Sequence, residues 1–211
     1  MKTPNLLKLT AAALLLVAAN ASAQIINSDH NFSSAGWNST GEICIVCHAA
    51  HNNNNEAGEM LWNHALSTAT YTVYSSPTFS QTAGQPSGAS KLCLSCHDGT
   101  VSLDSFGGGA NSGAGFINGG VLGGTNFGID LGNDHPISFP YVVAAGEELH
   151  PITKNVTFGD GSTGNIEDML FGDQVECSSC HDVHNTKSGN NSTLLLITND
   201  NSQLCLTCHE K

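Results

Sequence analysis

The hydrophobic and polar residues of this 211-residue chain follow no periodic pattern for more than a few positions at a time. β-Branched and aromatic residues at 70–74 predict a weak strand, and residues 165–173 predict a short helix. A short apolar run at 194–197 predicts one further buried segment. Such short and scattered patterns predict mostly irregular backbone with few helices and minor strands.

One longer apolar run lies near the N-terminus, between two lysines and the sequence Ala21-Ser22-Ala23. A basic start, an apolar centre and a small-x-small ending are typical of a secretory signal peptide. We therefore expect residues 1–23 to direct Sec export and to be cleaved before Gln24. The run is too short to predict a transmembrane segment. Residues 24–42 then form a polar arm, for which no packed helix is predicted.

Residues 107–132 contain 11 of the 23 glycines, which predicts a flexible or tightly looping connection. A phosphate-binding loop is a poor alternative, because no Gly-Lys-Ser/Thr follows and no strand-turn-helix frame surrounds it. Small polar residues also mark possible helix starts. Ser90 stands where a cap would precede one helix, and residues 199–202 offer caps for the last one.

All eight cysteines of the chain occur in four copies of Cys-x-x-Cys-His. On one helical turn, positions i, i+3 and i+4 share a face, so both sulfurs and the imidazole can address one porphyrin edge and its iron. This pattern is the attachment signature of haem c, in which the thiols bind the porphyrin and the histidine is the proximal iron ligand. The predicted residues are Cys44, Cys47 and His48; Cys93, Cys96 and His97; Cys177, Cys180 and His181; and Cys205, Cys208 and His209.

Two other readings of these cysteines are less favourable. A single Cys-x-x-Cys-His could be a zinc half-site or a redox dithiol, and eight cysteines in an exported chain could form four disulfides. Four complete copies, each with its histidine and with no cysteine outside them, favour four covalently bound haems c.

The composition also predicts that protein side chains fill only a small part of the interior. Cleavage would leave 188 of the 211 residues for four haems, and only 39% of the chain is hydrophobic and 6% aromatic. We therefore expect one domain over residues 24–211 whose core is formed largely by the four haems, with the run at 194–197 packed on a porphyrin. Loss of Lys2 and Lys8 takes the formal net charge from −12 to −14. Nucleic acid and anionic lipid surfaces are poor partners for such a chain.

The four motifs are of two types, and these two types occur in the same order in each half of the chain. The second and fourth both read Ser-x-Leu-Cys-Leu-x-Cys-His, whereas the first and third both continue as His-x-x-His. This doubling predicts two dihaem units, at about 41–106 and 133–211, joined by the glycine-rich connection. In each His-x-x-His the two histidines lie about one helical turn apart, so they cannot bind opposite faces of one iron. His51 and His184 must therefore serve other irons, or none.

Six histidines lie outside the proximal positions, whereas four irons need only four distal ligands. His64, beside an aromatic residue, and His135, held by the following proline, are good candidates. His150 is weaker because its surroundings look exposed. Methionine ligation is poorly supported, since only Met60 and Met169 would survive cleavage. A reductase would keep one iron open to substrate, and this surplus of histidines argues against it.

The blocks GEICIVCHAAH, LWNH, SKLCLSCHDGTVSLDSF, DHPISF, CSSCHDVHN and LCLTCH, in this order over residues 41–209, resemble the doubled Cys-x-x-Cys-His cytochromes. They are most similar to the OmcE-type extracellular tetrahaem cytochrome nanowire subunits. The resemblance implies a multihaem cytochrome c fold, mostly coil with a few short helices, and haems stacked in a continuous chain. It also implies bis-histidine ligation, with distal ligands at His51, His64, His135 and His184.

The same resemblance implies head-to-tail polymerisation into a conductive filament on the cell surface. The expected function is electron conduction without catalysis, between donor cytochromes of the periplasm or outer membrane and extracellular acceptors such as metal oxides. A monomeric periplasmic shuttle is the alternative. In such filaments one distal histidine comes from the neighbouring subunit, and we hypothesise that His51 has this role; His51 binding within its own chain, or His30 or His150 acting in its place, stay open.

Overall fold

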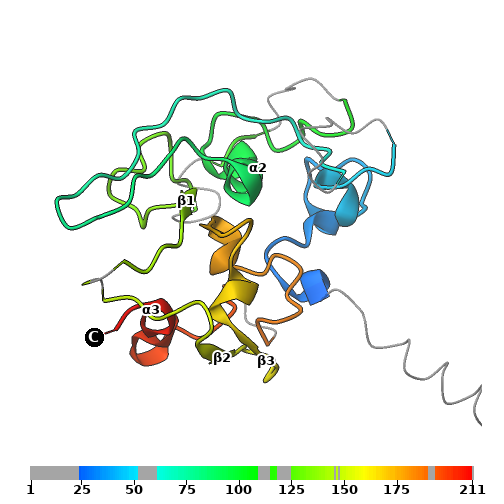
Figure 1. Cartoon of the computed structure of the whole chain (residues 1–211). Coiled ribbons are helices and arrows are strands. Elements are labelled where there is room, and N and C mark those ends of the chain that lie inside the picture. The colour runs from blue at the N-terminus through cyan, green and yellow to red at the C-terminus, as the bar shows by residue number, and fades with distance from the viewer. Residues whose placement is uncertain are drawn as a thin grey trace, which may run out of the picture.

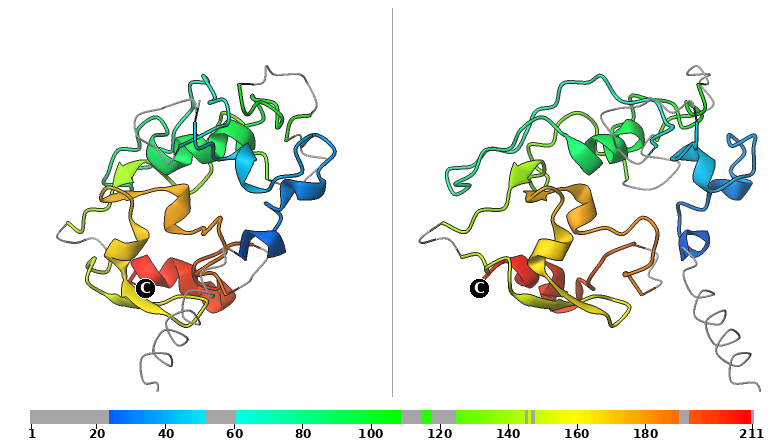
Figure 2. Two further views of the ribbon diagram at one scale, coloured as in Figure 1. Left: turned by 90° about the vertical axis from the view of Figure 1, so that its right-hand side faces the viewer. Right: turned by 45° about the vertical axis from the view of Figure 1, so that its right-hand side comes forward.

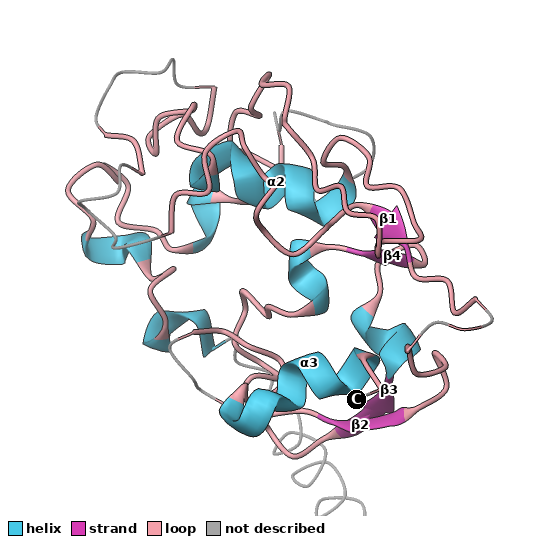
Figure 3. Cartoon of the chain, turned by 90° about the vertical axis from the view of Figure 1, so that its left-hand side faces the viewer, coloured by secondary structure: helices cyan, strands magenta, loops and turns pink. Residues whose placement is uncertain are grey.

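Irregular backbone makes up most of the chain in this computed structural model, as the sequence predicts. The structure describes residues 24–51, 61–108, 115–117, 125–144, 146, 148–189 and 193–210. The predicted signal peptide and much of the glycine-rich connection therefore lie outside the described residues. The α-helices described are α2 (Gly88–His97) and α3 (Gln203–Cys208), and Figures 1 and 3 show them on opposite sides of the molecule. None of the described helices is long and apolar enough to cross a membrane.

Two small antiparallel sheets join segments of the C-terminal half. Strand β1 (Phe139–Pro140) pairs with β4 (Gln174–Val175), and β2 (Asn155–Thr157) pairs with β3 (Thr163–Asn165). The predicted strand at 70–74 is not formed: only an isolated bridge joins Thr72 to Asp130. Its β-branched residues have no second strand beside them to make a ladder.

Single turns of 3-10 helix supply the remaining regular structure. They are η2 (Gln24–Asn27), η3 (Phe32–Ser34), η4 (Cys44–Val46), η5 (Ile166–Met169), η6 (Cys177–Ser179) and η7 (Asp200–Ser202). The turn η5 lies within the helix predicted at 165–173. It begins with a capping box, in which the side chains of Asn165 and Asp168 each accept a hydrogen bond from the backbone N–H of the other residue.

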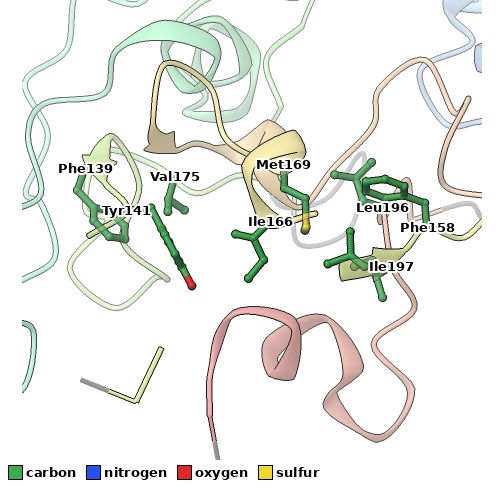
Figure 4. Close-up of a cluster of buried hydrophobic side chains, with 9 residues drawn as sticks. Phe139, Tyr141, Phe158, Ile166, Met169, Val175, Leu196 and Ile197 are labelled. Carbon is green, nitrogen blue, oxygen red and sulfur yellow. The ribbon is translucent and has the colours of Figure 1, made fainter. Parts of the chain in front are cut away.

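The main hydrophobic cluster lies in the C-terminal half, next to α3 (Figure 4). Its buried members lie in or directly after β1 and β2, in β4 and η5, and in the run before η7: Phe139, Tyr141, Val156, Phe158, Ile166, Met169, Val175, Leu196 and Ile197. Leu196 and Ile197 thus pack on protein side chains. A smaller cluster of Tyr71, Leu94 and Leu131 packs beside α2.

The N-terminal segment is more ordered than a polar arm. It runs along one edge of the molecule in Figures 1 and 2 and forms the turns η2 and η3. The buried side chain of Asn38 donates to the carbonyls of Phe32 and Glu42 at 3.0 Å each. Phe32 packs against Trp37, which in turn contacts Phe106. Side-chain hydrogen bonds and aromatic contacts replace the hydrophobic periodicity that the sequence lacks.

The two predicted caps have different outcomes: the cap at Ser90 is wrong, whereas the cap within 199–202 is confirmed in position. Helix α2 begins at Gly88 with Ser87 as N-cap, so Ser90 lies inside the helix, where its side chain is fully buried. The last motif helix, α3, has Ser202 as N-cap, but the Ser202 side chain makes no capping hydrogen bond.

Candidate haem-binding sites

Each Cys-x-x-Cys-His motif lies on a helical turn. The second motif ends α2 and the fourth ends with α3, whereas the first and third begin with the 3-10 turns η4 and η6. The backbone N–H of His48 donates to Cys44 at 2.8 Å, and that of His181 donates to Cys177 at 3.1 Å. These i to i+4 bonds bring the first cysteine and the histidine to one side of the turn, as attachment to one porphyrin requires. The Leu-Cys-Leu and His-x-x-His types therefore differ in local structure as they do in sequence.

The eight cysteines are all described, and none forms a disulfide. Within the described part of the chain, no three His, Cys, Asp or Glu side chains gather closely enough to hold a metal ion.

The cysteines place the first three motifs next to one another in chain order. Burial, and then the nearby Cys47, raise the pKa of Cys96 to about 12, so the first motif lies beside the second. A hydrogen bond with Cys177, and then burial, raise the pKa of Cys93 well above its ordinary value, so the second motif lies beside the third. Burial disfavours the thiolate but does not penalise a thioether, which carries no charge.

The fourth motif continues the same order. Burial, and then Cys208, raise the pKa of Cys180 to about 11, which places the third motif beside the fourth. One contact between the two halves of the chain is made by α2 and η6, where the backbone N–H of Cys177 donates to the Ser90 hydroxyl at 2.9 Å. The four motifs thus form one spatial series.

Backbone carbonyls hold the Nδ1 atoms of several histidines. The Nδ1 of His97 lies 2.8 Å from the carbonyl oxygen of Thr125, and that of His181 lies 3.1 Å from the carbonyl oxygen of Thr193. When Nδ1–H donates to such a carbonyl, Nε2 is left as the free nitrogen that can bind a metal. His64 and His135 use the carbonyl of the following residue in the same way, at 2.9 Å each.

Two of the predicted distal histidines lie near proximal histidines. The rings of His48 and His184 are stacked, with centroids 6.1 Å apart and an interplanar angle of 15°. The centroids of His135 and His209 are 6.5 Å apart at 74°. Two imidazoles bound to opposite sides of one metal, each through a bond of about 2 Å, would have centroids about 6 Å apart. Both separations fit a shared iron.

A pocket of about 450 Å³ opens beside the fourth motif. It is lined by His150, Leu206, His209 and Glu210. His150 is turned toward Glu210, with 3.0 Å between Nδ1 and Oε1. The pocket therefore offers a proximal imidazole and an apolar side chain to a bulky group.

The other two predicted distal histidines are placed differently. His64 is fully buried, burial lowers its pKa, and its Nε2 lies 3.6 Å from Cys96 Sγ of the second motif. His51 is exposed at the end of a described stretch. Their roles as iron ligands, like those of His135 and His184, stay predictions.

His30 is a histidine that the predicted ligand set leaves out. Its ring centroid lies 6.0 Å from that of His97, and its buried Nδ1 has no hydrogen-bond partner among the described residues. Burial, and then His97, lower the pKa of His30 to about 4. In the sequence, His30 lies in a polar segment without periodicity, so only its residue type pointed to a ligand.

The donor set fits haem c. Paired thiols and an imidazole occur at the helical element of each motif, and two further imidazoles lie near proximal ones, at centroid separations that fit one iron. The family model described as the doubled CXXCH motif matches residues 171–211, which hold the third and fourth motifs. This match supports a multihaem c-type cytochrome family and indicates covalently bound haem c. Among curated proteins, no sequence matches the chain.

Proposed function

We propose that the chain carries four haems c, one on each motif, and conducts electrons between them in a homopolymeric filament outside the cell. Bound haem supplies an iron that cycles between its ferric and ferrous states. The protein contributes the spacing of the motifs and the imidazoles on both sides of each iron. This assigns the chain to electron transfer without catalysis.

The spatial series of the four motifs carries this proposal. A cysteine of each motif lies close enough to a cysteine of the next to affect its pKa, from the first motif to the fourth. The chain thereby holds four attachment sites close together along one path, which outer-sphere electron transfer between neighbouring haems needs.

His51 is the residue that we assign to the contact between subunits. It is exposed, it follows the first motif, and it cannot bind the iron of its own motif. His51→Ala is expected to prevent normal filament assembly. His150→Ala is the comparison, because His150 is another histidine that stays open for this contact; if His51 has the role, His150→Ala should assemble normally. Normal His51→Ala filaments with four low-spin haems would contradict the assignment.

The cytochrome itself is tested by the intact mass and spectrum of the exported chain, produced in a host that attaches haem c. We expect four haems per chain and a ferric spectrum that is entirely low-spin. A high-spin signal that changes on addition of nitrite would instead indicate an open iron and a reductase.

The high negative charge favours a second candidate, a monomeric periplasmic shuttle. A chain of net charge −14 after cleavage repels its own copies, because it has only four lysines to offset its acidic residues. Sedimentation of the haem-loaded chain at physiological ionic strength separates the two: polymers support the filament, and monomers support the shuttle.

A further inference from the structure

The N-terminal segment presents a buried imidazole to the second motif. His30 lies between η2 and η3, its ring packs against Phe32, and its Nδ1 is buried without a hydrogen-bond partner among the described residues. A buried nitrogen without a partner costs free energy, so an imidazole in such a place normally has a ligand or another partner to bind.

The partner that the geometry offers is the iron of the second motif. The His30 and His97 centroids are 6.0 Å apart, with ring planes at 60°. Two imidazoles on opposite sides of one metal, each bonded at about 2 Å, are expected at about 6 Å. The His97 Nδ1 lies 2.8 Å from the carbonyl oxygen of Thr125, which leaves its Nε2 for the metal.

We propose that His30, through its buried Nδ1, is the distal ligand of the iron held by the second motif, within the same chain. This inference rests on the proposed function, because it requires haem at this motif. It adds His30 to the ligand set predicted from the sequence.

The structure of the segment explains how His30 reaches this position. The Asn31 side chain donates to the carbonyl of Ile26 at 2.9 Å and caps η3 by accepting from the backbone N–H of Ser33. Trp37 contacts Phe106, which follows the second motif in the chain. These contacts dock the segment onto the same part of the molecule that holds His97.

The competing ligand for this iron is His64. Its Nε2 lies 3.6 Å from Cys96 Sγ, so it approaches the second motif at a point of covalent attachment. His30 instead lies ring against ring with the proximal histidine. If His30 binds here, His135 near His209 and His184 near His48 are the candidates for two further irons. One iron then remains for His51 and His64, so one of these two is not needed.

The test compares haem-loaded wild type with His30→Ala, His30→Met and, as control, Ser34→Ala, an exposed position in the same segment. Ferric electron paramagnetic resonance measures spin state, and potentiometric titration measures the four reduction potentials. In His30→Ala we expect about one haem in four to become high-spin, and added imidazole to restore it. His30→Met should stay low-spin with one raised potential, because methionine in place of histidine raises the potential of haem.

Three results would overturn the inference. The first is a His30→Ala chain whose haems all stay low-spin. The second is a high-spin fraction that imidazole does not restore and that His30→Met does not convert into a raised potential, since His30 would then only support the fold. The third is the same high-spin fraction in Ser34→Ala. Failure of the proposed function is seen separately, as a wild-type chain that lacks four haems.

Discussion

At the scale of single residues, the segment after the second motif depends on one buried carboxylate. Asp98 follows His97 directly and is only 3% exposed. The Tyr71 hydroxyl donates to it at 2.6 Å, and the backbone N–H and the hydroxyl of Thr100 each donate at 2.8 Å. These bonds fix the backbone next to the proximal histidine, since a buried carboxylate is stable only when its oxygens are satisfied.

Tyr71→Phe should therefore weaken the fold in a pH-dependent way. Burial, and then the hydrogen bond to Asp98, raise the pKa of Tyr71 to about 12. An unfolded tyrosine ionises near pH ~10, so the contribution of Tyr71 is complete below that pH and is lost as the pH rises toward the folded pKa. At neutral pH the substitution should cost about 1–3 kcal/mol of unfolding free energy.

Denaturant unfolding between neutral pH and strongly alkaline pH measures this effect. Wild type should lose stability above pH ~10 more steeply than Tyr71→Phe. Tyr74→Phe is the control, because the ring of Tyr74 packs on Phe79, whereas Asp98 accepts its tyrosine hydrogen bond from Tyr71. Equal alkaline losses in wild type and Tyr71→Phe would contradict the argument.

The sequence could identify those functional residues whose partners lie within a few positions in the chain. Each motif carries its cysteines and proximal histidine within five positions, and the structure places the first cysteine of every motif in a helical element. His30 and Tyr71 are different, because their partners His97 and Asp98 are distant in the chain. The spacing of residues in the sequence does not predict such tertiary contacts.

At the scale of elements, the junction between α2 and η6 shows why a predicted cap was wrong. Ser90 was expected to begin the helix, but it lies inside α2, where its hydroxyl accepts the backbone N–H of Cys177. Nearby, the Ser138 hydroxyl accepts from the N–H of Ser87 and donates to the buried carboxylate of Glu176, at 3.0 Å each. Serine is favoured at helix N-caps, but here the hydrogen bond between the two halves of the chain places Ser90 inside the helix.

Ser90→Ala and Ser87→Ala form a matched pair at this junction. Ser90→Ala leaves the Cys177 N–H without its side-chain acceptor, so it should cost about 1–3 kcal/mol of unfolding free energy. Ser87→Ala should change stability by less than about 0.5 kcal/mol, because the exposed Ser87 side chain makes no capping bond. Thermal unfolding of both variants measures the difference, and similar losses in the two would argue against the junction.

At the scale of the whole molecule, the sequence correctly predicted a mostly coil fold with few short elements. It did not predict the nine-residue hydrophobic cluster, because its members come from short strands and turns that lie far apart in the chain. The pairing of β1 with β4 is of the same kind, since two-residue strands leave no readable alternation. The spatial series of motifs likewise depends on contacts across the α2–η6 junction.

Charge should control self-assembly of the whole molecule. Copies that each carry a net charge of −14 after cleavage repel one another, and the range of that repulsion falls from about 30 Å at 0.01 M salt to about 10 Å at 0.1 M. Light scattering of the haem-loaded chain should therefore show larger assemblies as salt is raised. Assemblies that dissociate on addition of salt would contradict this account, because attraction between charges would then hold the copies together.

The central claim is a continuous series of haems that passes through each chain and from one chain to the next. Electron cryo-microscopy of the exported, haem-loaded protein tests it most directly. The account predicts filaments in which every subunit holds four haem densities in the order of the motifs, each close to the next and to the first haem of a neighbouring subunit. Dispersed single chains, or subunits with fewer than four haems, would contradict it.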